Sequence, residues 1–100
     1  MEIKKGNNKF YVGTEEAPLA EIIFSIDNEV IIAEGTKVSE ELGGKGVGKL
    51  LLKELIDWAR KENKKIKPIC PFVIAQMEKN VEYHDMLAWW PPILFFNRLN

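Results

Sequence analysis

The sequence predicts an α+β fold in which a mixed, mostly antiparallel sheet is built in the order β-β-β-α-β-α. Three observations support this. The first third of the chain is made of short β-branched and aromatic runs separated by turns, and the middle changes to helical spacing. A strand, a glycine-rich loop, a helix and a further strand then follow one another, which is the order of a βαβ crossover.

Three strands are expected in the first third, at 8–13, 19–27 and 29–39. The segment 14–18 carries acidic residues and a proline and is expected to be a turn. Asp27 and Asn28 form a hairpin turn between the second and third strands. Gly35 lies inside the third strand, where glycine indicates a β-bulge or a close backbone approach.

The helix is predicted over 46–62, because its apolar residues recur at helical spacing while most charged residues fall on other faces. Those apolar residues are Val47, Leu51, Leu55, Trp58 and Ala59. Asn63 is a candidate for its C-terminal end. A short strand is expected at 65–70, parallel to the strand before the helix. A second helix begins at Pro71, directly after Cys70, since proline suits a first helical position.

Composition bounds the function. With 100 residues and a net charge of -1, the chain has the size of one domain and no global field that would favour nucleic acid. The single cysteine excludes an internal disulfide, and no signal-peptide pattern begins the sequence, so we expect a cytoplasmic location. No apolar run is long enough for a membrane span. One cysteine and one histidine make a zinc site implausible, so no metal is expected.

The end of the chain differs in character. We divide the sequence into a domain over 1–87 and an aromatic tail over 88–100, in which Pro91 and Pro92 prevent a continuous helix. Two alternatives remain open for this tail. Either it packs on its own sheet, beside the splayed strands, or it forms a surface for a partner or for a homodimer, since large aromatics anchor interfaces when they are not in a core.

The glycines of "EELGGKGVGKLLLKEL" approach several phosphate-binding motifs. Gly43, Gly48 and Lys49 fit a Walker loop, but Leu50 stands where the motif needs a magnesium-binding hydroxyl. The dinucleotide pattern fails because Lys49 occupies a glycine position. Coenzyme A remains, since it needs neither a metal nor an acid for the ribose.

A strand that leads through this loop into a helix directs backbone amides and the positive helix end at one point. Lys45 and Lys49 add charge at the rim, and the lack of Cβ atoms lets a pyrophosphate approach. A glycine-rich turn without a ligand is the simpler alternative. We favour a ligand, because four glycines in six residues lower stability more than a plain turn requires.

The same stretch resembles the acetyl-CoA-binding motif of the GNAT acetyltransferases, Arg/Gln-x-x-Gly-x-Gly/Ala, with Gly46 and Gly48 at the small positions and Gly43 as a departure at the first. Together with "PICPFV" it is similar to a minimal GNAT subgroup in which a strand ends in Cys-Pro-Phe or Cys-Pro-Tyr. The resemblance covers about residues 1–87 and implies a GNAT-like fold and acetyl-CoA as co-substrate.

The resemblance also implies the donor site. Pantetheine would lie in the gap between the strands Val30–Ser39 and Ile66–Cys70, with the backbone of Val38 along its arm. A backbone N–H on the first of these strands would polarise the thioester carbonyl. The pyrophosphate would lie on loop amides. The residues expected to bind the donor are Val38, Gly43, Gly44, Lys45, Gly46, Val47, Gly48 and Lys49.

Two residues are candidates for catalysis. Cys70 precedes a helix N-terminus, a position that favours the reactive thiolate, and the resemblance places it near the acetyl group. It would accept the acetyl group or protonate the CoA thiolate; the alternative is a buried small hydrophobe. Glu34 would act as a base. The subgroup usually has histidine at the next position, where this chain has Gly35.

Other candidates are weaker. Met77 stands where many GNAT enzymes have the tyrosine that acts as general acid, and Tyr83 lies about one turn too late to replace it. His84 is expected to be an ordinary surface residue. Glu40 and Glu41 are expected to be helix-entry residues that favour the positive dipole end.

Two functions follow. The first is an N-acetyltransferase with an open acceptor site suited to a protein or peptide, because the turn 14–18 leaves no helical lid. The second is a non-catalytic acyl-CoA-binding or protein-interaction module of the same fold.

Overall fold

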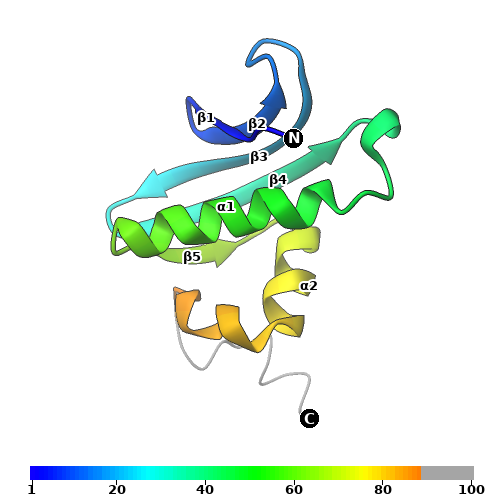
Figure 1. Ribbon diagram of the computed structural model, residues 1–100. Helices are drawn as coiled ribbons and strands as arrows, with labels where there is room; N and C mark the ends of the chain where they lie inside the picture. Colours follow the sequence, from blue (N-terminus) through cyan, green and yellow to red (C-terminus); the bar gives the residue numbers. More distant parts are fainter. Residues whose placement is uncertain (89–100) are drawn as a thin grey trace.

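The computed structural model describes residues 1–88, and the predictions for the tail at 89–100 lie outside them. Five strands, two α-helices and two short 3-10 helices follow one another along these residues (Figure 1). Their bounds are β1 Lys4–Gly6, β2 Lys9–Gly13, β3 Pro18–Asp27, β4 Val30–Val38, η1 Glu40–Leu42, α1 Val47–Lys61, β5 Lys65–Pro68, α2 Pro71–Lys79 and η2 Val81–Met86. The element order confirms the predicted α+β fold.

The sheet has the strand order β1-β2-β3-β4-β5. Neighbouring strands are antiparallel except β4 and β5, which run parallel with Val30 opposite Lys65 and Ala33 opposite Pro68. Helix α1 connects these two strands and lies across the sheet (Figure 1). The predicted βαβ crossover is therefore present. Within residues 1–88, no helix is long and apolar enough to cross a membrane.

The core lies between the sheet and the apolar face of α1. On the helix side it contains Val47, Leu51, Leu52, Leu55, Ile56 and Ala59, each no more than 1% exposed. The sheet contributes Ile22, Phe24, Ile31 and Ala33. The rings of Phe10, Phe24 and Trp58 pack together with centroids 5.5 to 6.1 Å apart. These contacts fix the helix on the sheet and so fix the position of its N-terminus.

The bulge predicted at Gly35 is present. Ile23 lies opposite Gly35, whereas the next residue, Phe24, lies opposite Ala33, so Glu34 is the extra residue on β4. Because a bulge shifts the alternation of faces, Ala33 and Thr36 share the side of the sheet that α1 covers. Glu34 lies on the opposite side.

Strand β1 and the two 3-10 helices were not predicted. Strand β1, of sequence KKG, has no apolar residue, and it exists because it pairs with β2 through the turn at Asn7 and Asn8. Asn8 adopts a left-handed φ of 61°, which asparagine tolerates. The predicted strand 65–70 is too long. It ends at Pro68 because the N–H groups of Ile69 and Cys70 both donate to the carbonyl of Ala33.

Candidate functional site

The loop before α1 is built on two left-handed glycines. Gly44 and Gly46 have φ values of 76° and 72°, which side-chain-bearing residues rarely adopt. A Cβ atom at either position would meet no atom within 4 Å. Glycine is thus required there by backbone conformation rather than by crowding. The open space also leaves these backbone atoms accessible to a ligand.

The first turn of α1 presents unpaired donors and a positive charge. The first backbone hydrogen bond of the helix runs from the Leu50 N–H to the Gly46 carbonyl, at 3.1 Å. The N–H groups of Val47, Gly48 and Lys49 precede that bond and have no acceptor inside the helix. The turn contains no acidic residue, and Lys49 adds positive charge at the positive dipole end. This arrangement favours an anion.

Beside the loop, strands β4 and β5 separate. Strand β5 pairs with β4 only from Val30 to Ala33, whereas β4 continues to Val38. From Glu34 onward, β4 therefore has β3 on one side and, within residues 1–88, no strand on the other. A sheet edge of this kind offers N–H and C=O groups to an extended ligand.

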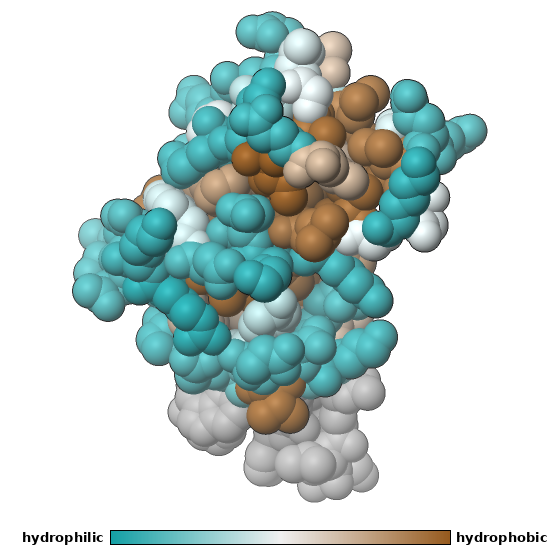
Figure 2. All heavy atoms as spheres, in the orientation of Figure 1, coloured by the Kyte–Doolittle hydropathy of each residue, from teal (hydrophilic) through white to brown (hydrophobic). Residues whose placement is uncertain are grey.

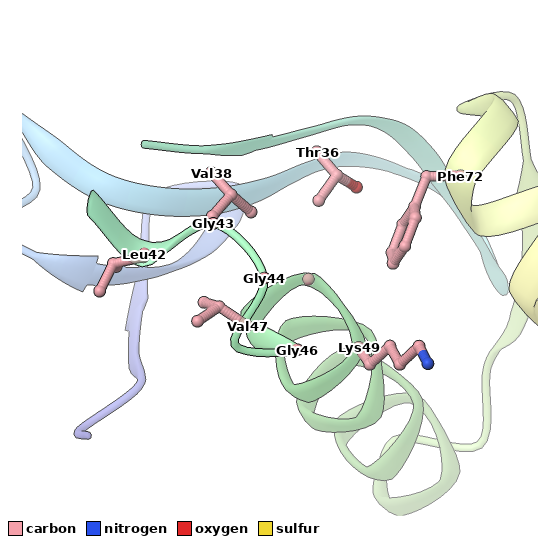
Figure 3. Close-up of a pocket in the computed structure, with 10 residues that line it drawn as sticks. Thr36, Val38, Leu42, Gly43, Gly44, Gly46, Val47, Lys49 and Phe72 are labelled. Carbon is pink, nitrogen blue, oxygen red and sulfur yellow. The ribbon is translucent and has the colours of Figure 1, made fainter. Parts of the chain in front are cut away.

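A pocket of about 370 Å³ joins the loop to this open edge (Figure 3). It is lined by Thr36, Val38, Leu42, Gly43, Gly44, Gly46, Val47, Gly48, Lys49 and Phe72. Of the eight residues predicted to bind the donor, seven are in this set; Lys45 is not. Figure 2 shows apolar surface beside the projecting hydrophilic side chains at the upper right, the end where Figure 1 places η1 and the loop.

Gly48 makes a different contribution from the other loop glycines. A Cβ atom there would lie 3.0 Å from Cζ and 3.3 Å from Cε2 of Phe72. Such contacts are tighter than most contacts of real Cβ atoms, so the ring would have to shift slightly to make room for a side chain at position 48. Glycine at position 48 thus leaves room for the ring of Phe72. The sequence motif does not suggest this reason for the glycine.

Cys70 lies where β5 ends and α2 begins. It is the N-cap residue of α2, and its N–H donates to the carbonyl of Ala33 at 3.0 Å. The side chain is 6% exposed, with Sγ 3.6 Å from Oγ1 of Thr36. Thr36 in turn lines the pocket. Cys70 is therefore separated from the pocket by one side chain, at the point where the two parallel strands part.

Glu34 lies at the same point, on the other side of the sheet. It is exposed, and Oε2 accepts a hydrogen bond of 2.7 Å from the Ser25 hydroxyl of β3. Glu34 and Cys70 thus flank the start of the gap from opposite faces. Gly35, next to Glu34, would have no atom within 4 Å of a Cβ, so the gap is open there.

The remaining candidates lie elsewhere. Met77 is completely buried in the core and offers no titratable group. Tyr83 and His84 lie in η2, where Arg60 of α1 donates to the Glu82 carbonyl, and thus near the end of α1 opposite the glycine loop. Nε2 of His84 is 3.0 Å from the Glu78 carbonyl oxygen. Glu40 and Glu41 belong to η1, ahead of the loop.

Sequence reasoning missed Thr36, Leu42 and Phe72 as pocket residues. Phe72 had a signal, because it belongs to the "PICPFV" motif. Thr36 had none, since the bulge at Glu34 decides which way it faces. Within residues 1–88 no three His, Cys, Asp or Glu side chains form a group that could hold a metal ion.

Two solved structures resemble this chain, and both are named as N-acetyltransferases. A GCN5-like candidate N-acetyltransferase from Staphylococcus aureus, solved by NMR, is 48% identical, with a TM-score of 0.74 and 86% of each chain covered. The ribosomal-protein-S18-alanine N-acetyltransferase from Escherichia coli is 20% identical, with a TM-score of 0.58. The alignment covers 75% of this chain and 53% of the Escherichia coli chain, and it shows a similarity of fold alone.

No curated protein matches the chain. A family model described as GCN5-related N-acetyl-transferase matches residues 9–86, which run from the start of β2 to the end of η2. The match includes the glycine loop, the open edge of β4 and Cys70, the features that surround the pocket. The chain therefore belongs to the GCN5-related N-acetyltransferase family.

Proposed function

We propose that this protein is an acetyl-CoA-dependent N-acetyltransferase that transfers the acetyl group to an amine of a protein or peptide. The observation that supports this most directly is the pocket that joins the amide-rich start of α1 to the unpaired edge of β4. One part of it suits phosphate and the adjoining part suits an extended amide chain. Coenzyme A combines both in one molecule.

The residues present fit such a donor. The amides from Gly44 to Lys49 and the charge of Lys45 and Lys49 would hold the pyrophosphate, because anions bind at helix N-termini. The pantetheine arm would lie along the edge of β4 at Val38, forming backbone hydrogen bonds like an added strand. A bound anion would also stabilise the first turn of α1, which lacks an acidic residue.

The chemistry would take place where β4 and β5 part. The acceptor nitrogen attacks the thioester carbon, its proton passes to Glu34 directly or through water, and the carbon–sulfur bond breaks. A backbone N–H of β4 would stabilise the oxyanion. Cys70 would either protonate the departing CoA thiolate or first accept the acetyl group as a thioester that the amine then attacks. Both routes remain part of the proposal, because each needs only that Cys70 lies beside the gap between β4 and β5.

The acceptor would approach from the side of the sheet that bears Glu34. In the described chain, β2 and β3 are joined by residues 14–17 without a helix, so no helical lid covers that side. An open approach suits a large acceptor such as a protein or peptide.

We also propose a cytoplasmic location, consistent with a single free cysteine, and a homodimer formed through residues 88–100.

A second function is favoured by a specific observation. Met77, at the position of the family's tyrosine acid, is completely buried, and Gly35 leaves empty space where the minimal subgroup has histidine. Both suit a module that binds acyl-CoA without efficient transfer. Gly35→His tests whether the missing histidine limits transfer. The substitution should be tolerated, since residue 35 has no left-handed φ and a side chain there meets no atom. We expect this substitution to raise transfer without changing donor affinity.

Calorimetric titration tests the donor, with acetyl-CoA compared with ATP and magnesium. We expect acetyl-CoA to bind and ATP to bind more weakly or not at all, and tighter ATP binding would refute the proposal.

Intact-mass spectrometry after incubation with acetyl-CoA tests whether the acetyl group passes through Cys70. An acetyl adduct in the wild type that is absent in Cys70→Ala supports transfer through the cysteine. Unchanged transfer in Cys70→Ala, or no alkylation of Cys70 by iodoacetamide, would show that the cysteine is structural.

A further inference from the structure

Phe72 is the one residue of α2 that lines the pocket within the described chain. It follows Pro71 in the first turn of that helix, and its ring is partly buried against the core. In Figure 3 the ring extends from α2 toward the first turn of α1. Phe72 thus closes the pocket on the side where the two helices approach each other.

The tip of the ring rests on α1 at Gly48. The three nearest atoms to an added Cβ at Gly48 are Cζ, Cε2 and Cε1 of Phe72, at 3.0, 3.3 and 3.6 Å. Gly48 lies in the same turn as Val47 and Lys49, whose N–H groups have no acceptor inside the helix and suit an anion. An aromatic hydrocarbon surface is therefore held directly beside the amides that suit a phosphate. Such a surface cannot bond to phosphate, but it can contact an apolar group attached to one.

The phosphopantetheine arm has such a group. Next to its phosphate come one methylene and then a quaternary carbon that carries two methyl groups, and the hydroxyl and amides follow farther along. We propose that Phe72 recognises this dimethyl group of the pantoyl unit and is a specificity-determining residue for the donor. The inference rests on the proposed function, because it needs the donor phosphate on the amides of α1.

The opposite wall of the pocket supports the same placement. Val38 and Leu42 contribute further apolar side chains, and Val38 is the last residue of the unpaired edge of β4. The dimethyl group would then be enclosed between Phe72 and these residues, and the amides of the arm would continue along β4. Gly48 supports this arrangement because a side chain at position 48 would require the ring of Phe72 to shift.

The test is a thermodynamic cycle measured by calorimetry with CoA and a synthetic CoA that lacks the two methyl groups. Burying two methyl groups predicts that the wild type binds the analogue about tenfold more weakly than CoA. In Phe72→Ala we expect CoA to bind more weakly and the difference between the two ligands to fall to about twofold or less, since contacting groups are not additive. Ile74→Ala, a half-buried change on α2 outside the pocket, should keep the wild-type ratio.

A second measurement needs no variant. Nuclear Overhauser effects between the ring protons of Phe72 and the two CoA methyl signals are expected in the complex of the wild type with CoA. An unchanged ratio in folded Phe72→Ala, or the absence of these effects in a complex that does form, overturns the inference alone. If CoA does not bind the wild type at all, the proposed function falls with it.

Discussion

The two ends of α1 are built in opposite ways. At the C-terminal end the backbone is closed: the Lys64 N–H donates to the Ala59 carbonyl at 2.9 Å, and Asn63 adopts the left-handed φ of 57° that this closure requires. The side chain of Arg60 then binds both carboxylate oxygens of Asp85, at 2.8 and 3.2 Å. At the N-terminal end the cap is Gly46, which has no side chain, and the amides after it are open.

This difference distinguishes a structural end from a functional one. The last turn carries Arg60 and Lys61, which complement the negative dipole end, whereas the first turn contains Lys49 and no acid. Helix stability alone would favour Ser, Thr, Asp or Asn at the cap. The chain instead keeps left-handed glycines there, and under the proposed function a bound donor would supply the stability that a cap would add.

The largest expected effect comes from a substitution at the open N-terminal end of α1. Gly46→Asp should reduce acetyl-CoA affinity by about 100-fold or more, because a carboxylate would face the donor phosphates at close range. The free energy of unfolding should fall by about 1 kcal/mol, because the left-handed φ of 72° strains any side-chain-bearing residue, although aspartate tolerates it better than most. Calorimetry and urea unfolding measure the two effects.

Gly46→Asn is the matched control, with the same shape and no charge. It should bind acetyl-CoA at least about tenfold more tightly than Gly46→Asp. Equal affinity for the two variants would show that the loop does not hold an anion.

At the closed end, Arg60→Ala should lower the free energy of unfolding by roughly 1 kcal/mol, in the upper part of the range for an exposed pair because the guanidinium also donates to the Glu82 carbonyl at 2.7 Å. Acetyl-CoA affinity should stay unchanged. Lys53→Ala is the control, since its exposed pair with Asp57 joins two residues of the same helix and does not reach η2. A loss of donor binding in Arg60→Ala would contradict the separation of the two ends.

Asn63 tests the backbone closure itself. Asn63→Ala should destabilise the protein by about 0.5–1 kcal/mol, because alanine adopts a left-handed φ less readily than asparagine. Asn63→Gly should be neutral or slightly stabilising. Urea unfolding of both variants decides the matter, and equal destabilisation by the two would point to a lost side-chain contact instead.

The smallest effect depends on pH. The hydrogen bond from Arg60 lowers the pKa of Asp85 below its usual value. A carboxyl with a lowered folded-state pKa contributes stability above its unfolded pKa of about 3.9, and that contribution is lost as the pH falls through the folded value. Because Asp85 is largely exposed, we expect Asp85→Asn to cost a few tenths of a kcal/mol near pH 6 and progressively less as the pH falls below about 4. A cost that does not decrease as the pH falls would exclude this ion pair as the cause.

The local patterns predicted most of the elements. Apolar residues at helical spacing place α1 at Val47–Lys61, within one residue of the predicted 46–62 at each end. Gly35 indicated the bulge in β4, and Asn63 the end of α1. Strand β1 was not predicted, because its sequence, KKG, contains none of the residues that favour strands. It is a strand only because it pairs with β2.

By itself, the sequence determined the element order, the glycine loop and the apolar face of α1, because turn residues and hydrophobic periodicity act over a few neighbouring positions. Only the tertiary structure decided that β5 leaves β4 after Ala33, that Thr36 lies between the pocket and Cys70, and that Phe72 rests on Gly48. These contacts join residues 24 to 35 positions apart. No local pattern encodes such distances, since packing of the whole core decides where each element comes to lie.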